Sequence, residues 1–348
     1  MKKSAHEDKL FPMIRDFLTD YLPNKRFYSP NTITAYRTAL NLLLDFICAD
    51  NTVELYQVSF AMITPDVLLR FLDWLEQKRQ CSPTTRNHRL VCIRSFYKYA
   101  GMMDITIAAY RQSMMKVPLK KTETSKTVKF LDENALRILL QQPTPSNPKG
   151  FRDLFYMVLI YDTGCRNQEI LDLKVKDVHA SEKNPYITVT GKGNKTRVVP
   201  IMVKTVQYFK KYIQLFHKET DAECCLFYIR SKGLYQKMSP DNVARFMLKY
   251  GNLASENGAE IPGKLHPHMF RSTRAMHLYR GGMPLPLLSE WLGHANLETS
   301  MIYAYADTEM KRQAILRATA AQNPLNAELI DANQTTDTQL LKILYGLR

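Results

Sequence analysis

The sequence predicts a mainly α-helical protein with a small β-sheet, in which a helical unit is followed by a mixed α/β unit. Three observations predict this fold class. Apolar residues recur at helical spacing over most of the chain, one segment alternates with the two-residue period of a strand, and a polar segment with neither period separates the two parts. A length of 348 residues also suits two domains better than one.

The first unit, residues 1–118, is predicted to be a bundle of about four helices. Apolar residues within 10–21 fall on one helical face, which needs a core to cover it. Ser29, Thr64 and Ser82 each precede a proline, and a hydroxyl followed by proline is typical of a helix N-terminus. We therefore expect amphipathic helices to begin at these three places.

The helix that begins after Ser82 also carries a run of basic side chains. Its hydrogen-bond donors crowd near a helix N-terminus, which favours phosphate, although a solvated helix face is the alternative. We predict a DNA-facing helix whose contacts come from Arg86, Arg89, Arg94 and Lys98.

The second unit, residues 128–320, is predicted to mix helices with a β-hairpin. Segment 119–127, which precedes it, has no helical period and is interpreted as an exposed linker. Asp132 is expected to cap a short helix, and the alternating residues of 186–200 predict a hairpin with a Gly-Asn turn. Further helices are expected around 152–161, 203–217, 239–249, 269–280 and 284–292.

The C-terminal tail, residues 321–348, is polar except for an apolar patch near its end. We interpret this patch as a short terminal helix that docks on a neighbouring protomer. Its residues are Leu340, Leu341, Ile343 and Leu344.

The charge of the chain predicts a polyanionic partner. Net charge is +15 and the isoelectric point is near 9.4. Residues 1–120 hold 17 basic and 11 acidic side chains, and the rest holds 31 and 22, so the surplus is not confined to a tail. A protein that binds nucleic acid fits this balance, and so do ribosomal and membrane-surface proteins.

Cysteine usage and hydropathy bear on metal content and location. The 6 cysteines show no paired CxxC spacing, so zinc is not predicted. No stretch approaches the roughly 18 apolar residues of a membrane span. We expect a cytoplasmic protein with reduced thiols, no membrane contact, no metal and no other cofactor.

Motifs in the second unit resemble those of a known family. They are TGCRNQEILDL (163–173), GKGNKTRVVP (191–200), HPHMFRSTRA (266–275) and WLGHANLETSMIYAY (291–305). Together and in this order they resemble the catalytic motifs of the tyrosine recombinase, or phage integrase, family. The segments SPNTITAYRTAL and SPTTRNHRLVCIRSFYKY resemble that family's helical, SAM-like core-binding domain. The resemblance implies a core-binding domain in residues 1–118 and a catalytic domain in 128–320.

The resemblance also implies a set of catalytic residues. Two arginines would clamp the phosphate, because a guanidinium fork matches two phosphate oxygens. The lysine would be the general acid that protonates the departing 5′ oxygen. The tyrosine would be the nucleophile, and it needs positive surroundings because a phenol has a pKa near 10. These residues are Arg166, Lys192, His268, Arg271, His294 and Tyr303.

Each of these residues has an ordinary alternative when it is considered alone. Arg166 could simply pair with Glu169, GKGNK could be a basic turn, and a histidine or tyrosine is usually a packing residue. In the motif context Glu169 is interpreted as the carboxylate that orients Arg166, while Lys195 and Arg197 would touch phosphates.

One departure from the family pattern is Ser272. Many relatives carry a histidine after the second arginine, and we expect the Ser272 hydroxyl to supply a hydrogen bond in its place. Cys165, before Arg166, stands where an apolar residue is usual and is expected to pack.

The implied reaction is site-specific recombination of double-stranded DNA. Attack by Tyr303 would leave a 3′-phosphotyrosine and a free 5′ hydroxyl, so rejoining would need neither ATP nor metal. A homotetramer would join two duplexes through a four-way junction, with accessory DNA-bending proteins as further partners, to integrate or excise a mobile element. A type IB topoisomerase and a DNA-binding regulator on an inactive scaffold are the alternatives. A regulator of that kind would be expected to have lost at least one catalytic residue, whereas this chain retains Arg166, Lys192, Arg271 and Tyr303.

Overall fold

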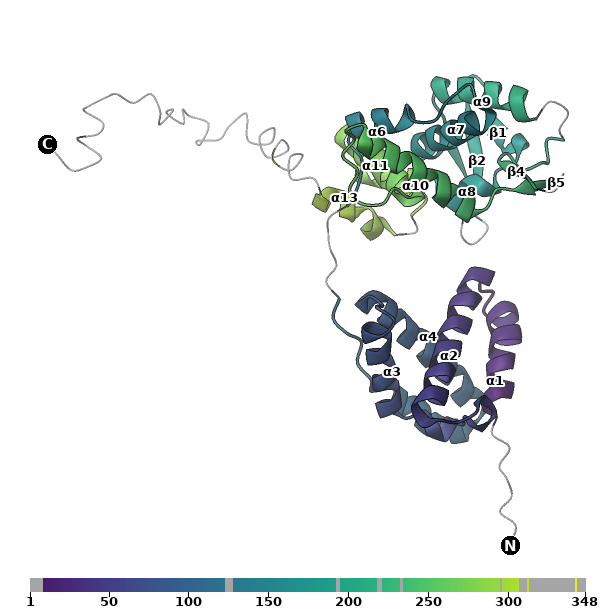
Figure 1. The fold of residues 1–348 in the computed structure, drawn as a ribbon, viewed down its shortest axis with the longest axis vertical. Helices are drawn as coiled ribbons and strands as arrows, with labels where there is room; N and C mark the ends of the chain where they lie inside the picture. The colour runs from purple at the N-terminus through teal and green to yellow at the C-terminus, as the bar shows by residue number, and fades with distance from the viewer. Residues whose placement is uncertain are drawn as a thin grey trace, which may run out of the picture. The chain divides into compact units, whose positions relative to one another are not determined.

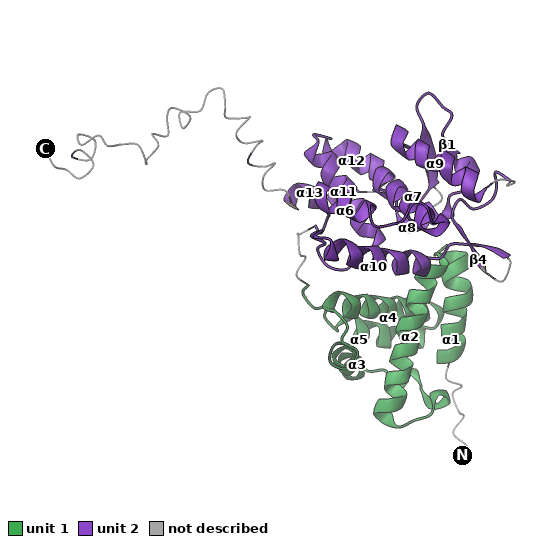
Figure 2. Ribbon diagram, turned by 45° about the horizontal axis from the view of Figure 1, so that its top comes forward, with its two compact units in different colours: residues 1–124 green, residues 125–348 purple. Residues whose placement is uncertain are grey.

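The structure is a computed structural model that describes residues 9–122, 128–191, 195–217, 221–231, 234–294 and 296–306, together with Arg312 and Lys342. Two compact units, Met1–Thr124 and Ser125–Arg348, divide the chain (Figure 2). The division falls inside the predicted linker, and the limits 118, 128 and 320 stay predictions. The described residues form mainly helices, together with two small antiparallel sheets. The predicted fold class, mainly α with a small β-sheet, is therefore confirmed.

Unit 1 is helical in its described part (Figure 1). Its longer helices begin where the sequence predicts, because the side chains of Ser29, Thr64 and Ser82 each accept a hydrogen bond from a backbone N–H in the first turn. The elements are α1 (Leu10–Asp16), π-helix η1 (Phe17–Lys25), α2 (Pro30–Asn51), α3 (Pro65–Gln77), α4 (Pro83–Met103) and α5 (Ala108–Met115), with 3-10 turns η2 (Leu55–Gln57), η3 (Phe60–Met62) and η4 (Ile105–Ile107).

Two features of unit 1 differ from the sequence prediction. The single helix expected over 10–21 changes at Phe17 into a π-helix that contains Pro23, which has no N–H to donate to an α-helical ladder. Helix α5 was not predicted, and its N-cap residue Ile107 makes no side-chain cap hydrogen bond, so the usual start signal is absent. Both segments are held by the shared core, in which Phe17 and Phe96 lie 5.5 Å apart between ring centroids.

Unit 2 mixes helices with two small sheets. The predicted hairpin is confirmed as β2 and β3, paired from Tyr186↔Pro200 to Thr190↔Thr196. Strand β1 and the hairpin β4–β5 were missed, because β1 has two residues and every described side chain of β5 is exposed, which leaves no alternation to detect. The strands are β1 (Val178–His179), β2 (Tyr186–Thr190), β3 (Thr196–Pro200), β4 (Tyr228–Ser231) and β5 (Leu234–Lys237).

Six described helices of unit 2 lie on predicted segments and agree with them to within a few residues at most ends, whereas the short helices Asn167–Asp172 and Met301–Ala306 were not predicted. The helices of unit 2 are α6 (Glu133–Leu140), α7 (Pro148–Thr163), α8 (Asn167–Asp172), α9 (Val203–Phe216), α10 (Pro240–Glu256), α11 (Pro267–Arg280), α12 (Leu285–Leu292) and α13 (Met301–Ala306), with 3-10 turns η5 (Val175–Asp177) and η6 (Leu297–Thr299). Asp132 caps α6 as expected, accepting a hydrogen bond from Ala135 N.

Helix α7 is the central element of unit 2 and packs against both α9 and α11. Phe155, Leu159 and Ile160 on α7 are almost completely buried, which anchors the helix in the core. The first motif begins at its last turn, so this packing fixes where the motif residues emerge. No helix of the described residues is both long and apolar enough to cross a membrane.

Candidate active site

Two helices of unit 2 end side by side in glycines with left-handed backbone conformations. Gly164 follows α7 with φ +60°, and Gly293 follows α12 with φ +65°. A Cβ at Gly164 would lie 3.2 Å from Leu292 Cδ2, and one at Gly293 would lie 3.1 Å from atoms of the Arg197 guanidinium. Both positions therefore need glycine for conformation and for space.

Arg271 on α11 ties these two helix ends together. Its side chain donates hydrogen bonds to the backbone oxygens of Gly164 and Leu292, each at 2.7 Å, and the residue is 1% exposed. Burial, and then the neighbouring Arg166, lower its pKa to about 10, which leaves it a cation at neutral pH. No carboxylate of the described residues forms an ion pair with it, so its hydrogen bonds go to backbone carbonyls, while the more distant Glu169 carboxylate acts to raise its pKa.

Arg166 lies at the N-cap of α8 with its side chain 42% exposed. Its guanidinium donates to Glu169 Oε1 at 2.9 Å and to the Gly293 oxygen at 3.4 Å, and its backbone N–H donates to Glu169 Oε2 at 2.8 Å. The pairing with Glu169 that was the ordinary alternative therefore exists, and it leaves part of the guanidinium open to solvent. Arg166 and Arg271 belong to one cluster, as predicted from the motifs they occupy.

Arg197 on β3 is the second cation on Glu169, which corrects the prediction that Arg197 touches phosphates. It donates to both carboxylate oxygens, at 3.1 and 2.8 Å, and to Cys165 Sγ at 3.6 Å. Residue alternation along β3 turns Arg197 to the same side as the buried Val199. Burial alone would raise the pKa of Glu169, but hydrogen bonds from Arg197 and from the Arg166 backbone lower it to about 2. Lys195, by contrast, is exposed.

Lys192 lies outside the described residues, as does most of its turn. The described ends of the turn meet, since Gly191 N donates to the Lys195 oxygen at 2.8 Å. A Cβ at Gly191 would lie 3.3 Å from Glu169 Oε1, so the turn begins beside the Arg166 and Glu169 pair.

Two histidines of the motifs stand close to these arginines. His294 directly follows Gly293, and its Nδ1 lies 2.7 Å from Ser300 Oγ. Burial and then the charges of Arg271 and Arg166 lower the pKa of His294 to about 4. His268 is partly exposed on α11, and burial of the rest of its ring followed by Arg271 lowers its pKa as well. Both imidazoles are therefore neutral at neutral pH.

Tyr303 on the short helix α13 is 1% exposed and packs with the apolar residues of α11 and α12. Burial raises the pKa of its phenol, while Arg271 and a hydrogen bond with the Ser272 side chain act in the opposite direction. Ser272, the departure from the family pattern, therefore contacts the tyrosine directly. Tyr305, two residues on, is 48% exposed.

A further polar cluster supports this region and was not singled out from the sequence. Asp162, buried in the last turn of α7, accepts hydrogen bonds from Met202 N at 2.8 Å and Thr205 Oγ1 at 2.7 Å. Arg274 donates to Asp162 Oδ1 at 3.3 Å, and Trp291 Nε1 donates to the Thr163 oxygen at 3.0 Å. Thr163, Arg274 and Trp291 lie within the motifs and Asp162 directly precedes the first of them, and this position is their only sequence signal.

The basic residues predicted on α4 do not all face outward. Arg86 is 6% exposed and lies 3.5 Å from Glu76 Oε2, so the prediction that it contacts DNA is wrong. It precedes the buried Leu90 by four residues, which places both on one helical face. Arg89 donates to the Ala35 oxygen at 3.2 Å.

Arg94 and Lys98 lie further along α4 and differ in exposure. Arg94 donates to the Met115 oxygen at 3.0 Å and also to that of Val117, so it holds the chain that leaves α5. Lys98 is exposed. Among the predicted contacts on α4, Arg86, Arg89 and Arg94 are thus engaged with the protein itself.

Comparison with known proteins agrees with this arrangement. Residues 129–310 match the Phage integrase family, and residues 14–102 match the Phage integrase, N-terminal SAM-like domain. The tyrosine recombinase XerC of Herpetosiphon aurantiacus is 30% identical over 321 residues, covering 87% of this chain and 93% of the relative. The tyrosine recombinase XerD of Vibrio cholerae is 28% identical over 306 residues, covering 86% and 94%.

A solved structure shares the fold. The XerH site-specific recombinase bound to difH substrate, in a pre-cleavage complex, superposes with a TM-score of 0.63 at 22% identity, covering 84% of this chain and 80% of that one. The chain therefore belongs to the phage integrase family of tyrosine recombinases. It is an enzyme of the site-specific DNA recombinase class.

The low pKa of Glu169 predicts a pH dependence of stability. The ordinary glutamate pKa is 4.5 and the folded value is about 2, so this carboxylate stabilises the fold above about pH 4.5, and that contribution is lost as pH falls towards 2. In urea titrations between pH 6 and pH 3, the Glu169→Gln variant should lose less stability than the wild type, by about 2 kcal/mol in total. The exposed Glu260, changed to Gln, is the control. Equal pH slopes for wild type and Glu169→Gln would contradict the assignment.

Proposed function

We propose that this recombinase cuts and rejoins duplex DNA through a covalent bond between Tyr303 and the phosphate backbone. The observation that carries the proposal is the buried Arg271 cation, which contributes to the electrostatic environment of the Tyr303 phenol and is joined through two carbonyls to the helix ends that carry Arg166 and His294. A phosphodiester gains negative charge as it is attacked, so fixed cations stabilise the transition state.

Arg166 and Arg271 have different roles in binding the phosphate: Arg166 contacts it, and Arg271 supplies a fixed positive charge. Arg166 is held from behind by Glu169 and is partly open to solvent, which suits contact with an incoming phosphate oxygen. Arg271 stays charged because carbonyl oxygens accept its hydrogen bonds without neutralising it. Glu169 and Arg197 position Arg166 and touch no phosphate.

Proton transfer falls to Lys192 and the two histidines. Lys192 would protonate the departing 5′ oxygen, and its turn begins beside the Arg166 and Glu169 pair. His268 and His294 are neutral at neutral pH, so each can donate one hydrogen bond to a phosphate oxygen and accept another. The attack leaves a 3′-phosphotyrosine and a free 5′ hydroxyl.

Tyr303 has to leave its pocket before it can react. Its phenol is buried and its pKa is raised, which describes a protected nucleophile. Tyr303 lies in α13, which follows the 3-10 turn η6. We expect DNA binding to bring the phenol out beside both arginines, where positive charge favours the phenolate.

The reaction on DNA completes the proposal. The phosphotyrosine bond conserves the phosphoester energy, so rejoining needs neither ATP nor a metal ion. Four protomers would exchange strands between two duplexes through a four-way junction, in the cytoplasm, to integrate or excise a mobile element with the help of DNA-bending proteins. Lys98 and Lys195, both exposed, remain our proposed contacts to the DNA backbone.

Loss of the Tyr303 hydroxyl should abolish the covalent intermediate. With end-labelled duplex DNA from the flanks of the coding region, wild type should give a protein–DNA adduct on a denaturing gel, and Tyr303→Phe none. Tyr305→Phe is the matched control and should form the adduct. Chelator should leave the wild-type adduct unchanged. An adduct formed by Tyr303→Phe, or one lost on adding chelator, would refute the mechanism.

The four residues of the apolar patch in the tail all lie outside the described residues. If Leu340, Leu341, Ile343 and Leu344 dock on a neighbouring protomer, deletion of 325–348 should lower the proportion of tetramer on DNA in light scattering and leave binding of one protomer intact. Replacement of Thr335 and Thr336 by alanine, in the polar part of the tail, is the control. Unchanged assembly after the deletion would count against docking.

A further inference from the structure

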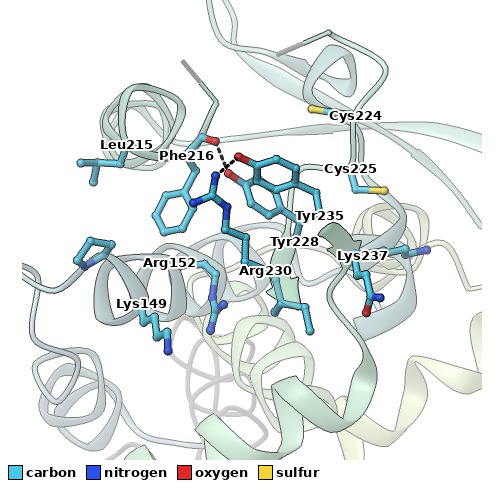
Figure 3. A pocket seen from close by; sticks show the side chains of 13 residues that line it. Lys149, Arg152, Leu215, Phe216, Cys224, Cys225, Tyr228, Arg230, Tyr235 and Lys237 are labelled. Carbon is cyan, nitrogen blue, oxygen red and sulfur yellow. Dashed lines mark hydrogen bonds between the residues drawn. The ribbon is translucent and has the colours of Figure 1, made fainter. Parts of the chain in front are cut away.

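A cavity in unit 2 has no residue in common with the proposed active site. It has a volume of about 820 Å³ and lies between the β4–β5 hairpin, the start of α7 and the end of α9. Figure 3 shows Cys224 and Cys225 on one side of it, Lys149 and Arg152 on the other, and Arg230 between them. Aromatic and cationic side chains thus line the same cavity as a pair of thiols.

The cavity carries unbalanced positive charge. Of its four cations, Arg152 pairs with Asp153 at 2.7 Å and Lys237 pairs with Asp172. Lys149, in the first turn of α7, and Arg230 have no carboxylate partner among the described residues. The Arg230 guanidinium lies 5.0 Å from the centroid of the Tyr235 ring. The cavity therefore favours an anionic occupant.

Cys224 is paired with a histidine whose tautomer is fixed by its surroundings. His217 Nε2 lies 2.9 Å from the Leu226 carbonyl oxygen, which can only accept, so Nε2 carries the hydrogen. His217 Nδ1 is then free of hydrogen in the neutral ring, and it lies 3.3 Å from Cys224 Sγ. The thiol consequently donates to Nδ1.

This arrangement matches the requirements for activating a thiol. A nucleophile lies within hydrogen-bond reach of a base, and a third group orients the base. His217 is 5% exposed, and burial lowers its pKa, so its ring is neutral at neutral pH and its unprotonated Nδ1 faces the thiol. Cys224 is only half-buried and lines the cavity, so a small reagent can reach it.

We propose that Cys224 is a nucleophilic thiol, with His217 as its base, which forms a mixed disulfide with small anionic disulfides that enter this cavity. His217 Nδ1 takes the thiol proton, and the sulfur of Cys224 attacks one sulfur of the reagent. The S–S bond of the reagent breaks as the new S–S bond forms, and the departing thiolate takes the proton from His217. Cys224 is oxidised and half of the reagent is reduced to a thiol.

The first test uses the unmodified full-length protein. It is incubated with oxidised glutathione, which carries carboxylates, and separately with cystamine, which carries amines, and the extent of reaction at every cysteine is followed by peptide mass spectrometry. Cys225, the adjacent half-buried thiol, is the internal control. Cys224 should react at least ~10-fold faster than Cys225 with oxidised glutathione. Rates within a factor of two of each other would overturn the proposal.

Two variants separate the base from the charge of the cavity. His217→Gln retains an N–H for the Leu226 oxygen but removes the base, so it should slow alkylation of Cys224 by neutral iodoacetamide about 10-fold. The double variant Lys149→Gln and Arg230→Gln should reduce the preference of Cys224 for oxidised glutathione over cystamine, which is measured as the ratio of the two rates so that a change in the reactivity of the thiol itself cancels. An unchanged alkylation rate in His217→Gln would rule out the base, and an unchanged preference in the double variant would rule out the anionic reagent.

Discussion

The site depends on one buried charge, the guanidinium of Arg271. A cation that is 1% exposed is costly unless its donors are satisfied, and here backbone oxygens of Gly164 and Leu292 satisfy them at 2.7 Å. Because these oxygens belong to the ends of α7 and α12, the charge can be buried only when the two helices end side by side. The packing of these two helix ends in unit 2 and the positive charge of the site therefore depend on the same two hydrogen bonds.

The remaining features follow from that junction. Left-handed glycines let the chain turn away from both helices and deliver Arg166 on one side and His294 on the other. The Glu169 carboxylate pairs with both Arg166 and Arg197. Because one negative charge is shared by two cations, Arg166 is held in position but keeps part of its positive charge. The Tyr303 side chain forms a hydrogen bond with Ser272, the serine that stands where many relatives carry a histidine.

Local signals in the sequence predicted the elements well, because such signals are decided by a few neighbouring residues. A hydroxyl before a proline marked the starts of α2, α3 and α4, and alternation marked β2 and β3. The motif residues Arg166, Arg271 and His294 were implied by the resemblance to the tyrosine recombinase family, and the structure brings them together. Arg86 and Arg197 were misread as DNA contacts, since only the folded chain reveals the carboxylates that Glu76 and Glu169 supply to them. The pairing of Cys224 with His217 likewise depends on the Leu226 carbonyl, which no spacing predicts.

The central claim is that a forked cation at position 271 both holds the two helix ends and stabilises the attacked phosphate. The most direct measurement is the rate of covalent DNA cleavage by Arg271→Lys, which keeps the charge but cannot reach both carbonyls with one planar group. The account predicts a rate at least ~100-fold below wild type in a chain that still folds and binds DNA. Cleavage at the wild-type rate would contradict it.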